Sequence, residues 1–271
     1  MTARELADAA GVSEAAVVRF AQALGFPGFP ELRAALRHEV LTRLGASALV
    51  QDEATPAAGT GAQSGSGDTE IIRRSFELDR GLVDATARLN GPAAISALAK
   101  RICGARRVWV TAHGTTFPAG HYLAMKLRQM LGEGEMLTLG VGDLAERLYA
   151  IAPEDVVIGI SLVRYFQATL DVMQAARNRE ATVVAITDSP SSPAARLATV
   201  TLLVARDAAA SHFSEVGLTS LINAVLAAVA VHSGERARRV LAEYDRMVRD
   251  WGVLADDPYS DPRPKGDGTR S

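Results

Sequence analysis

The sequence has little cysteine, few aromatic residues and no excess of basic charge, and each shortage excludes a class of protein. A single cysteine, Cys103, rules out a disulfide framework within the chain and argues against a cysteine-based zinc site. Aromatic residues make up 5% of the chain, so a core must be built mainly from Ala, Val, Leu and Ile. The net charge of -2 excludes the whole-chain basic field that is typical of nucleic-acid-binding proteins, so any contacts with DNA must be local.

The chain also has no recognisable targeting segment and no long apolar run. Its first residues are charged from Arg4 onward and contain no apolar stretch of signal-peptide length. The most apolar run, residues 221–231, is too short to cross a bilayer and predicts a buried helix. Hydrophobic residues at 48% and charged residues at 22% are ordinary values for a soluble protein with a core. We therefore expect a cytoplasmic protein with no membrane partner.

Composition divides the chain into four parts. Residues 1–44 are rich in Ala, Leu and charged residues at helical spacing, which predicts a helical module. Residues 45–70 predict a flexible linker, because this stretch is mostly Gly, Ser, Thr and Ala with almost no large apolar side chain to bury. Residues 71–254 predict a folded domain, and the polar residues 255–271, with three prolines, predict a disordered tail.

Helical and strand patterns alternate in the second domain. Short β-branched runs predict strands at 107–112, 155–161, 181–187 and 199–205, with a weaker candidate at 135–139. Helical patterns are found at 70–90, 92–103, 117–131, 143–150, 166–179 and 213–232. Strands that are apolar on both faces and alternate with helices indicate a mostly parallel sheet covered on both sides. The predicted fold class is therefore an α-helical helix-turn-helix module followed by an α/β doubly wound parallel-sheet domain.

The helix-turn-helix prediction comes from residues 3–22. Thr2 is placed to cap a first helix that ends near Ala9, and Gly11 supplies the sharp turn because glycine accepts a left-handed backbone. Ser13 is placed to cap a second helix that stops near Gly25. The apolar residues expected to pack between the two helices are Leu6, Ala10, Val12, Val17 and Phe20.

The second helix of such a motif lies in the major groove of DNA with its N-terminal residues toward the base edges. Position on this helix predicts the DNA-binding residues Ser13, Glu14, Ala15, Val18 and Arg19. Acidic and basic residues balance within 1–44, so one module would bind DNA weakly through charge. Binding a double-stranded operator then calls for a homodimer or homotetramer. The alternative is a helical hairpin that merely packs.

The stretch LADAAGVSEAAVVRFAQALGFPGFPELRAAL (6–36) resembles the helix-turn-helix of the RpiR/MurR family of bacterial regulators. The family pattern "LA…GVS…VVRFA..LGF.GF.EL" is kept almost throughout, including Arg19, Phe20, Gly25, Phe26, Gly28, Phe29 and Leu32. Ala16 departs from it, because members usually carry Thr or another small polar residue there. Members also usually have a further pair of helices before the one that starts here. The resemblance implies a DNA-binding transcriptional regulator.

Three segments that follow predicted strands carry hydroxyls and backbone amides at helix starts: 112–117, 161–166 and 187–192. In an open parallel sheet, ligands bind beyond the carboxyl ends of the strands, where such groups suit a phosphate or a sugar hydroxyl. Arg164 adds a cation that is suited to phosphate. Each segment alone is an ordinary helix cap, but three at one edge favour a small-ligand site.

Residues 95–250 resemble the SIS (sugar isomerase) fold, the usual sensor domain of these regulators. The family motif G-x-G-x-S corresponds to residues 112–116, the motif S-x-S-G-x-T keeps Ser161 and Thr169, and residues 186–198 match the third strand and loop. The resemblance implies a small, phosphorylated sugar as effector, without a cofactor. The predicted ligand-binding residues are Gly114, Thr115, Thr116, Ser161, Arg164, Tyr165, Thr187, Asp188, Ser189 and Glu215. The altered second motif implies either a rebuilt cradle or a ligand outside the usual sugar phosphates.

Two other functions stay open at this point. A sugar-phosphate isomerase needs a base near the reacting carbons, for which Glu215 and His212 are the candidates. A DNA-binding module on the same chain favours sensing, so no catalytic residue is predicted. A nucleotide-binding oxidoreductase has little support, because residues 112–117 do not form G-x-G-x-x-G. The histidines show no metal-ligand spacing, so no metal site is predicted.

Overall fold

The computed structural model describes residues 2–33, 36, 67–206 and 214–252. All but the last residues of the predicted linker (45–70) lie outside the described residues, and so do the predicted tail (255–271) and His212.

The first helix of the N-terminal module, α1 (Ala3–Ala10), has a complete cap at each end. The Thr2 hydroxyl accepts a hydrogen bond from the Glu5 amide, and the Glu5 carboxylate accepts one from the Thr2 amide. This reciprocal pair satisfies two backbone donors that the helix itself cannot. Gly11 ends the helix with a left-handed backbone at φ +66°. The predicted cap and turn are therefore confirmed.

The second helix, α2 (Glu14–Ala23), begins where the sequence predicted. The Ser13 hydroxyl accepts a hydrogen bond from the Ala16 amide at 3.2 Å. A further helical segment begins at Phe29 and is described as far as Arg33. The module therefore has a third helical element packed on the first two.

The predicted packing of this module is partly wrong. Its buried side chains are Ala7, Val17, Ala21, Phe29 and Leu32. Val12 and Phe20 are instead 48% and 57% exposed, and Ala10 is exposed as well. Val17 and Ala21 lie one turn apart on the inward face of α2, so Phe20 is turned about 80° away from the middle of that face. Phe29 and Leu32 of the third segment pack in this core, where the prediction placed Val12 and Phe20.

Five parallel strands form one sheet in the order β2-β1-β3-β4-β5. The strands are β1 (Val108–Ala112), β2 (Glu135–Leu137), β3 (Val156–Ile160), β4 (Thr182–Thr187) and β5 (Val200–Leu203). Each lies inside a predicted run, and the central strands β1 and β3 are buried at every position, as expected for strands covered on both faces.

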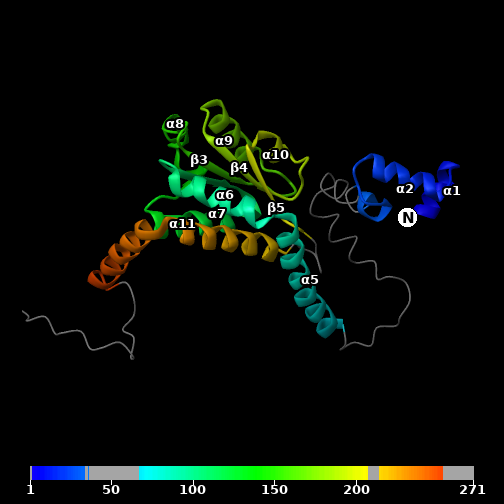
Figure 1. Ribbon diagram of the computed structural model, residues 1–271, viewed down its shortest axis with the longest axis horizontal. Coiled ribbons are helices and arrows are strands. Elements are labelled where there is room, and N and C mark those ends of the chain that lie inside the picture. The colour runs from blue at the N-terminus through cyan, green and yellow to red at the C-terminus, as the bar shows by residue number, and fades with distance from the viewer. Residues whose placement is uncertain (1, 34–35, 37–66, 207–213, 253–271) are drawn as a thin grey trace, which may run out of the picture.

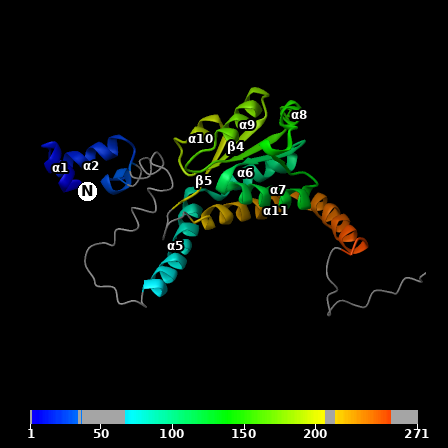
Figure 2. The ribbon, with the colours of Figure 1, turned by 180° about the vertical axis from the view of Figure 1, so that it is seen from behind.

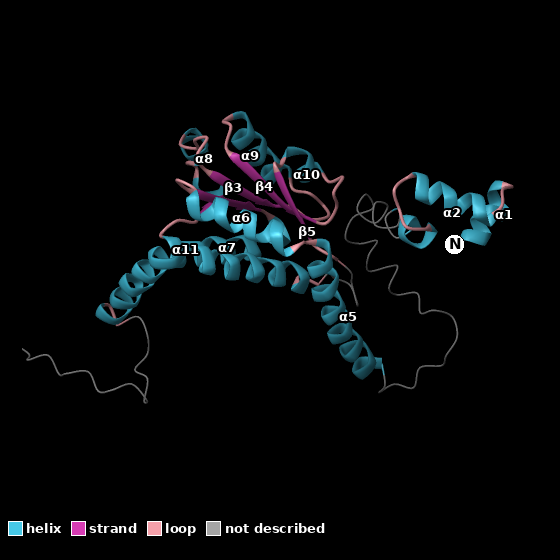
Figure 3. Cartoon of the chain, viewed as in Figure 1, coloured by secondary structure: helices cyan, strands magenta, loops and turns pink. Residues whose placement is uncertain are grey.

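Helices cover both faces of this sheet, as Figure 3 shows. Alternate strand residues point to opposite faces: Val108 and Val110 of β1 join one core cluster, and Trp109 joins the other. The first cluster includes side chains from α6 (Pro92–Gly104), α7 (Phe117–Leu131) and α11 (Val216–Asp250). The other face is covered by α8 (Leu144–Tyr149), α9 (Gln167–Asn178) and α10 (Pro193–Leu197). Two short 3-10 helices, η1 (Gly114–Thr116) and η2 (Leu139–Val141), lie in the connections. These layers confirm the predicted α/β fold class.

Two long helices extend beyond the sandwich, α5 (Gly67–Leu89) and the C-terminal part of α11. Figure 2 shows them projecting from the same side of the domain, at opposite ends of α11. The predicted helix at 213–232 therefore continues to Asp250, and it bends at Gly234, whose φ of +49° and ψ of -121° lie outside helical space. Glycine reaches such a backbone without the steric cost of a Cβ atom.

By length and composition alone, α11 is apolar enough to cross a membrane. Its apolar side chains from Leu218 to Val229 lie in the core cluster with α6 and α7. This packing is that of the buried helix predicted for residues 221–231.

Candidate functional site

The carboxyl ends of the parallel strands bring the three predicted segments to one edge. The strand order places β2 on one side of β1 and β3 on the other. The chain therefore reverses its direction of winding at the junction of β1 and β3. Ligands of such sheets bind at this switch point. The loop at 113–116 follows β1 and the loop at 161–166 follows β3, while the third segment follows β4, the next strand.

A small cavity lies between the loops of β1 and β3. Its volume of about 10 Å³ is enough for a single water molecule. Ser161 and His113 are part of its lining. Ser161 is 3% exposed, and neither its hydroxyl nor Nε2 of His113 has a hydrogen-bond partner among the described residues. Buried polar atoms are nearly always paired, so these two atoms are candidates to bind a small polar group in the cavity.

His113 is a site residue that the sequence prediction missed. Its Nδ1 lies 2.9 Å from Oγ1 of Thr169, at the start of α9, and this contact fixes the imidazole ring against the cavity. Burial lowers the pKa of the His113 imidazole below its usual value of 6.5. The signal was present in the sequence, because His113 stands inside the first quoted motif.

Phe166 covers the backbone of Gly114. Gly114 has a φ of +64°, and a Cβ atom built there would lie 2.2 Å from the Phe166 ring. The Phe166 ring therefore occupies the space directly above the Gly114 backbone. Phe166, which was not predicted as a site residue, lines the cavity and limits the space beside this loop.

Two predicted ligand contacts, Thr116 and Thr187, connect the strand ends in this structure. The Thr116 hydroxyl lies 3.0 Å from the carbonyl oxygen of His113 and 3.2 Å from that of Ile160. Thr187 is fully buried and donates to the Ser161 carbonyl at 2.7 Å. These bonds position the loops, and direct contact with a ligand stays a prediction for both residues.

Asp188 joins the β3 loop to the β4 loop. Its carboxylate accepts hydrogen bonds from the Val163 amide at 2.9 Å and from the Tyr165 hydroxyl at 3.0 Å. Arg206, at the end of β5, places Nη1 3.9 Å from the same carboxylate and Nη2 3.6 Å from Glu215. Arg206 was not predicted, although it directly follows the predicted strand at 199–205 and the strand-end rule applies to it equally.

Glu215 precedes α11 and lies half-buried beside Arg206. Burial raises the pKa of its carboxyl, and the nearby guanidinium acts in the opposite direction. The predicted residues Tyr165, Asp188 and Glu215 are thus brought together around Arg206, next to the cavity through Val163.

The remaining predicted ligand residues lie at the rim. Thr115 is exposed and lines the cavity. Arg164 is exposed, and its φ of +69° is unusual for a residue other than glycine. Ser189 has its hydroxyl 2.9 Å from that of Ser191.

The predicted DNA-binding residues run from the N-cap of α2 to its middle. Ser13, Glu14, Ala15 and Arg19 are exposed, and Val18 is half-buried. The Ser13 hydroxyl is occupied by the helix cap. The geometry leaves this end of the helix open to a partner.

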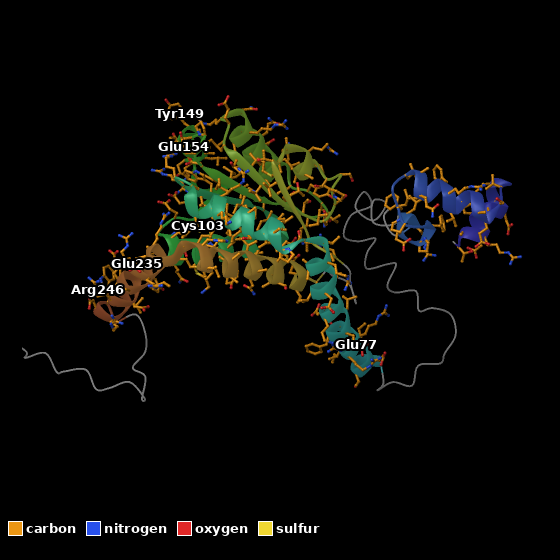
Figure 4. The ribbon with its side chains drawn as sticks, in the orientation of Figure 1. Glu77, Cys103, Tyr149, Glu154, Glu235 and Arg246 are labelled. Atoms are coloured by element: carbon orange, nitrogen blue, oxygen red, sulfur yellow. The ribbon has the colours of Figure 1, made fainter. Side chains whose placement is uncertain are left out.

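Metal-binding and cysteine chemistry were not predicted, and the described residues bear on both as follows. No group of three or more His, Cys, Asp or Glu side chains lies close enough there to hold a metal ion. Cys103, labelled in Figure 4, lies partly buried with its sulfur 3.7 Å from the Val229 carbonyl oxygen. Burial raises the pKa of this thiol, which disfavours the reactive thiolate.

We expect the free energy of unfolding to rise with pH as the pH approaches about 6.5 from below, because burial lowers the pKa of His113 in the folded chain. Its folded pKa is depressed, so in this range the unfolded chain binds a proton that the folded chain does not. The stabilisation is complete above the unfolded value of 6.5 and is lost as pH falls toward the folded value. Urea unfolding at several pH values should show a shallower slope for His113→Gln. His121→Gln, exposed on α7, should keep the original slope, and equal slopes in all three proteins would contradict this origin.

The two parts of the chain match two known domain families. Residues 1–43 match the helix-turn-helix domain of the rpiR family, and residues 101–232 match the SIS domain. A crystal structure of an RpiR transcription factor from Sphaerobacter thermophilus (sugar isomerase domain) is 34% identical, with a TM-score of 0.61. That match covers 65% of this chain and 99% of the other.

Two further solved structures share the fold. The NanR protein of Vibrio vulnificus, complexed with ManNAc-6P, is 21% identical over 94% of this chain and 88% of its own, with a TM-score of 0.60. A putative sugar-phosphate isomerase from Listeria monocytogenes is 16% identical over 71% of this chain and 98% of its own, with a TM-score of 0.51. Taken with the helix-turn-helix and the polar strand-end loops, these findings show that the chain belongs to the RpiR family of transcriptional regulators, with a DNA-binding domain followed by a SIS domain.

Proposed function

We propose that this protein is a cytoplasmic transcriptional regulator whose SIS domain binds a small phosphorylated sugar and thereby changes the affinity of the helix-turn-helix for its operator. One observation carries the proposal. The N-terminal part of α2 is exposed, and in the same chain the Ser161 hydroxyl and Nε2 of His113 lie at the switch point of the sheet without hydrogen-bond partners among the described residues. Allosteric coupling requires two distinct binding sites, which here are an effector site on the SIS domain and a DNA site on the helix-turn-helix.

The charged side chains at the two ends of the proposed site determine which end of the effector binds where. Its phosphate is assigned to the loops at 113–116 and 161–166, where the Phe166 ring would have to turn aside to let it meet backbone amides, the Ser161 hydroxyl and the Arg164 guanidinium. Its sugar hydroxyls fit the other end, because the carboxylates of Asp188 and Glu215 repel a phosphate but accept hydrogen bonds from hydroxyls. ManNAc-6P, bound by NanR, has both parts and supports this class of effector.

The effector is tested by thermal unfolding in the presence of hexose and amino-sugar phosphates, ManNAc-6P among them, with each free sugar as its matched control. A ligand at a hundred times its Kd adds about 2.7 kcal/mol to the folded state. We expect a rise in Tm with a phosphorylated sugar and a much smaller rise with its free form. Equal rises in Tm would mean that the phosphate does not contribute to binding. No rise with any compound of the panel would contradict a sugar effector.

The DNA-binding part is tested with Arg19→Ala on an operator selected from random duplexes. Arg19 is exposed on α2 and lies within reach of a groove, so its loss should weaken binding by about 1–3 kcal/mol, or roughly five- to 150-fold. Fluorescence anisotropy at fixed salt measures this. Arg4→Ala, an exposed arginine on α1, should change the Kd much less. Equal effects of the two variants would mean that α2 is not the reading helix.

A second function, sugar-phosphate isomerisation, has Glu215 in its favour. Its carboxyl is half-buried, with a raised pKa, beside the proposed sugar-binding end, which suits a general base. Turnover of an aldose or ketose phosphate that is lost in Glu215→Gln would support catalysis. Binding without turnover in both proteins would leave Glu215 as a ligand contact.

A further inference from the structure

The C-terminal end of α5 pairs with the strand β5, the last strand of the described sheet. Asn90, which directly follows α5, is buried, and its side-chain amide donates to the Leu203 carbonyl at 2.6 Å and accepts from the Leu203 amide at 2.9 Å. A residue of a neighbouring strand can make the same pair of bonds. The amide also donates to the Thr86 carbonyl at 2.8 Å, which fixes it to α5. Asn90 therefore takes the place that one more strand would have at the edge of the sheet.

Thr86, one turn before Asn90, holds the next part of the same segment. Its buried hydroxyl accepts a hydrogen bond from the Ala205 amide at 3.1 Å. The start of α11 packs at the same point, because a Cβ atom at Gly217 would lie 2.9 Å from both the Ala205 carbonyl oxygen and the Thr86 hydroxyl oxygen. Three elements thus meet here without room for a methyl group, and Figure 1 shows the end of α5 beside β5 and the start of α11.

Asp79 makes a third polar contact from two turns earlier in α5. Its carboxylate accepts a hydrogen bond from the Ser214 hydroxyl at 2.5 Å. The same hydroxyl lies 3.2 Å from the Val216 amide, at the start of α11. Spacings of seven and four residues place Asp79, Thr86 and Asn90 on one side of the helical path. We call these three residues the α5 clamp.

The α5 clamp contacts the two segments that carry the charged end of the proposed effector site. Arg206 directly follows Ala205, and Glu215 directly follows Ser214. The Arg206 guanidinium and the Glu215 carboxylate lie 3.6 Å apart. The residues that would meet a ligand are therefore joined through the backbone to the residues that α5 holds. A ligand that changes the distance between these two side chains displaces backbone groups of the clamp.

The other end of α5 leads toward the DNA-binding module. α5 is the first described helix after that module in the chain, and its described part begins at Gly67. Figure 2 shows this end projecting out of the sandwich, while the opposite end lies against the sheet. Coupling between distant sites is carried by rigid elements that have two discrete positions. A helix held at one end by three polar contacts, and continuing toward the DNA-binding module at the other, fits that description.

We infer that the α5 clamp transmits the state of the effector site to the DNA-binding module. In one state the clamp holds α5 against β5 and α11. In the other, contacts of the ligand with Arg206 and Glu215 shift residues 203–206 and 214–217 and release the clamp. A shift of about 1 Å is enough, because a hydrogen bond is lost when its distance grows from 2.9 to roughly 3.6 Å or more. The inference rests on the proposed function and names the residues that connect its two sites.

The test is a double-mutant cycle on operator binding, which does not require the effector to be known. Glu215→Gln removes the charge beside Arg206 and so changes the state of the site, while Thr86→Val with Asp79→Ala breaks two contacts of the clamp. The Kd of the full-length protein for an operator selected from random duplexes is measured by fluorescence anisotropy. We expect Glu215→Gln to change the Kd at least about fivefold when the clamp is intact, and less than about twofold when it is broken.

Two matched controls separate coupling from a purely structural role. Thr86→Ser keeps the hydroxyl that accepts from Ala205, and Asp84→Ala removes an aspartate that is exposed on the same helix. In both proteins Glu215→Gln should change the Kd as it does in the wild-type protein. Each comparison is made within one background, so a general loss of stability or of operator affinity cancels. If the double clamp variant fails to fold by circular dichroism, Asp79→Ala alone takes its place and should at least halve the fold-change.

Hydrogen exchange of the same proteins gives a result without DNA or sugar. With the clamp intact, Glu215→Gln should change the exchange rates of backbone amides at residues 79–90 at least about threefold, because local opening of this end depends on the clamp. With the clamp broken, Glu215→Gln should add no further change. Unaltered exchange at residues 79–90 in Glu215→Gln would overturn the inference, whatever the operator affinity.

Equal changes in Kd with the clamp intact and broken would also overturn the inference, as would a wild-type Kd for Glu215→Gln. These outcomes are distinct from failure of the proposed effector, because sugar binding is measured separately by thermal unfolding. A clamp-dependent response to Glu215→Gln with no sugar bound from the panel would contradict the sugar effector and leave the coupling standing. Sugar binding with no clamp-dependent response would have the opposite meaning.

Discussion

Asp188→Ala should abolish effector binding and lower the free energy of unfolding by about 2–4 kcal/mol. The carboxylate is 3% exposed and connects three strand ends. It accepts from the Val163 amide and the Tyr165 hydroxyl, and it faces the Arg206 guanidinium. Alanine removes both hydrogen bonds and one of the two carboxylates beside Arg206, so the β3 loop and the β5 end lose their common anchor. Breaking a buried charge pair costs more than the pair contributes, because the remaining charge is left poorly solvated.

Urea unfolding and calorimetric titration with the effector measure the two parts of this result. Asp188→Asn keeps the shape and an acceptor oxygen but removes the charge, so its loss of stability should be intermediate. Asp171→Ala is the matched control, since this aspartate is exposed on α9, where it accepts from Gln167. Its effect should stay within about 0.5 kcal/mol. A stable Asp188→Ala protein with normal effector affinity would show that the loops are held in place by other contacts.

The framework of the domain was predictable because its signals are local. Apolar β-branched runs separated by helical patterns identified the five strands, and the rule for parallel sheets placed the loops after β1, β3 and β4 at one edge. Caps were equally predictable, because Thr2, Gly11 and Ser13 act on backbone groups within three or four residues of themselves.

The site chemistry was less predictable because it depends on contacts between distant segments. Thr116 and Thr187 have the residue type of ligand contacts, but their hydroxyls meet backbone carbonyls of other loops. Phe166 covers Gly114 from another loop, 52 residues further along the chain. Arg206 matters through its burial between two carboxylates, which composition does not reveal.

Packing of the helices shows the same limit. The prediction considered only two helices in the N-terminal module and therefore placed Phe20 in the core. In the structure, Phe29 and Leu32 of the third segment are buried there and Phe20 is exposed. The last part of α11 is rich in charged residues, so its sequence resembles a solvated segment and the predicted helix ended at 232. Its apolar residues Leu241, Tyr244 and Met247 follow a helical spacing, which is recognised only once the helix is known to continue past Gly234.

Arg164→Gly should raise the stability of the protein and weaken effector binding at the same time. Arg164 holds a left-handed backbone at φ +69°, which costs a non-glycine residue about 1–2 kcal/mol. Glycine removes that cost but increases the entropy of the unfolded chain, so the net gain should be up to about 1 kcal/mol. The lost guanidinium contact with the phosphate should cost about 1.5–3 kcal/mol of binding, a ten- to hundredfold rise in Kd. Thermal unfolding without effector and titration with it give the two values.

Glu180→Gly separates these two effects. Glu180 has a comparable backbone, with φ +61°, and it is exposed in the turn between α9 and β4, at the amino edge of the sheet. This variant should gain the same stability and keep the wild-type Kd. A gain in both variants with a loss of affinity in Arg164→Gly alone would mean that a strained conformation is retained at Arg164 for the sake of the ligand. Unchanged affinity in Arg164→Gly would instead place the phosphate on the backbone amides and Ser161, without a contribution from this arginine.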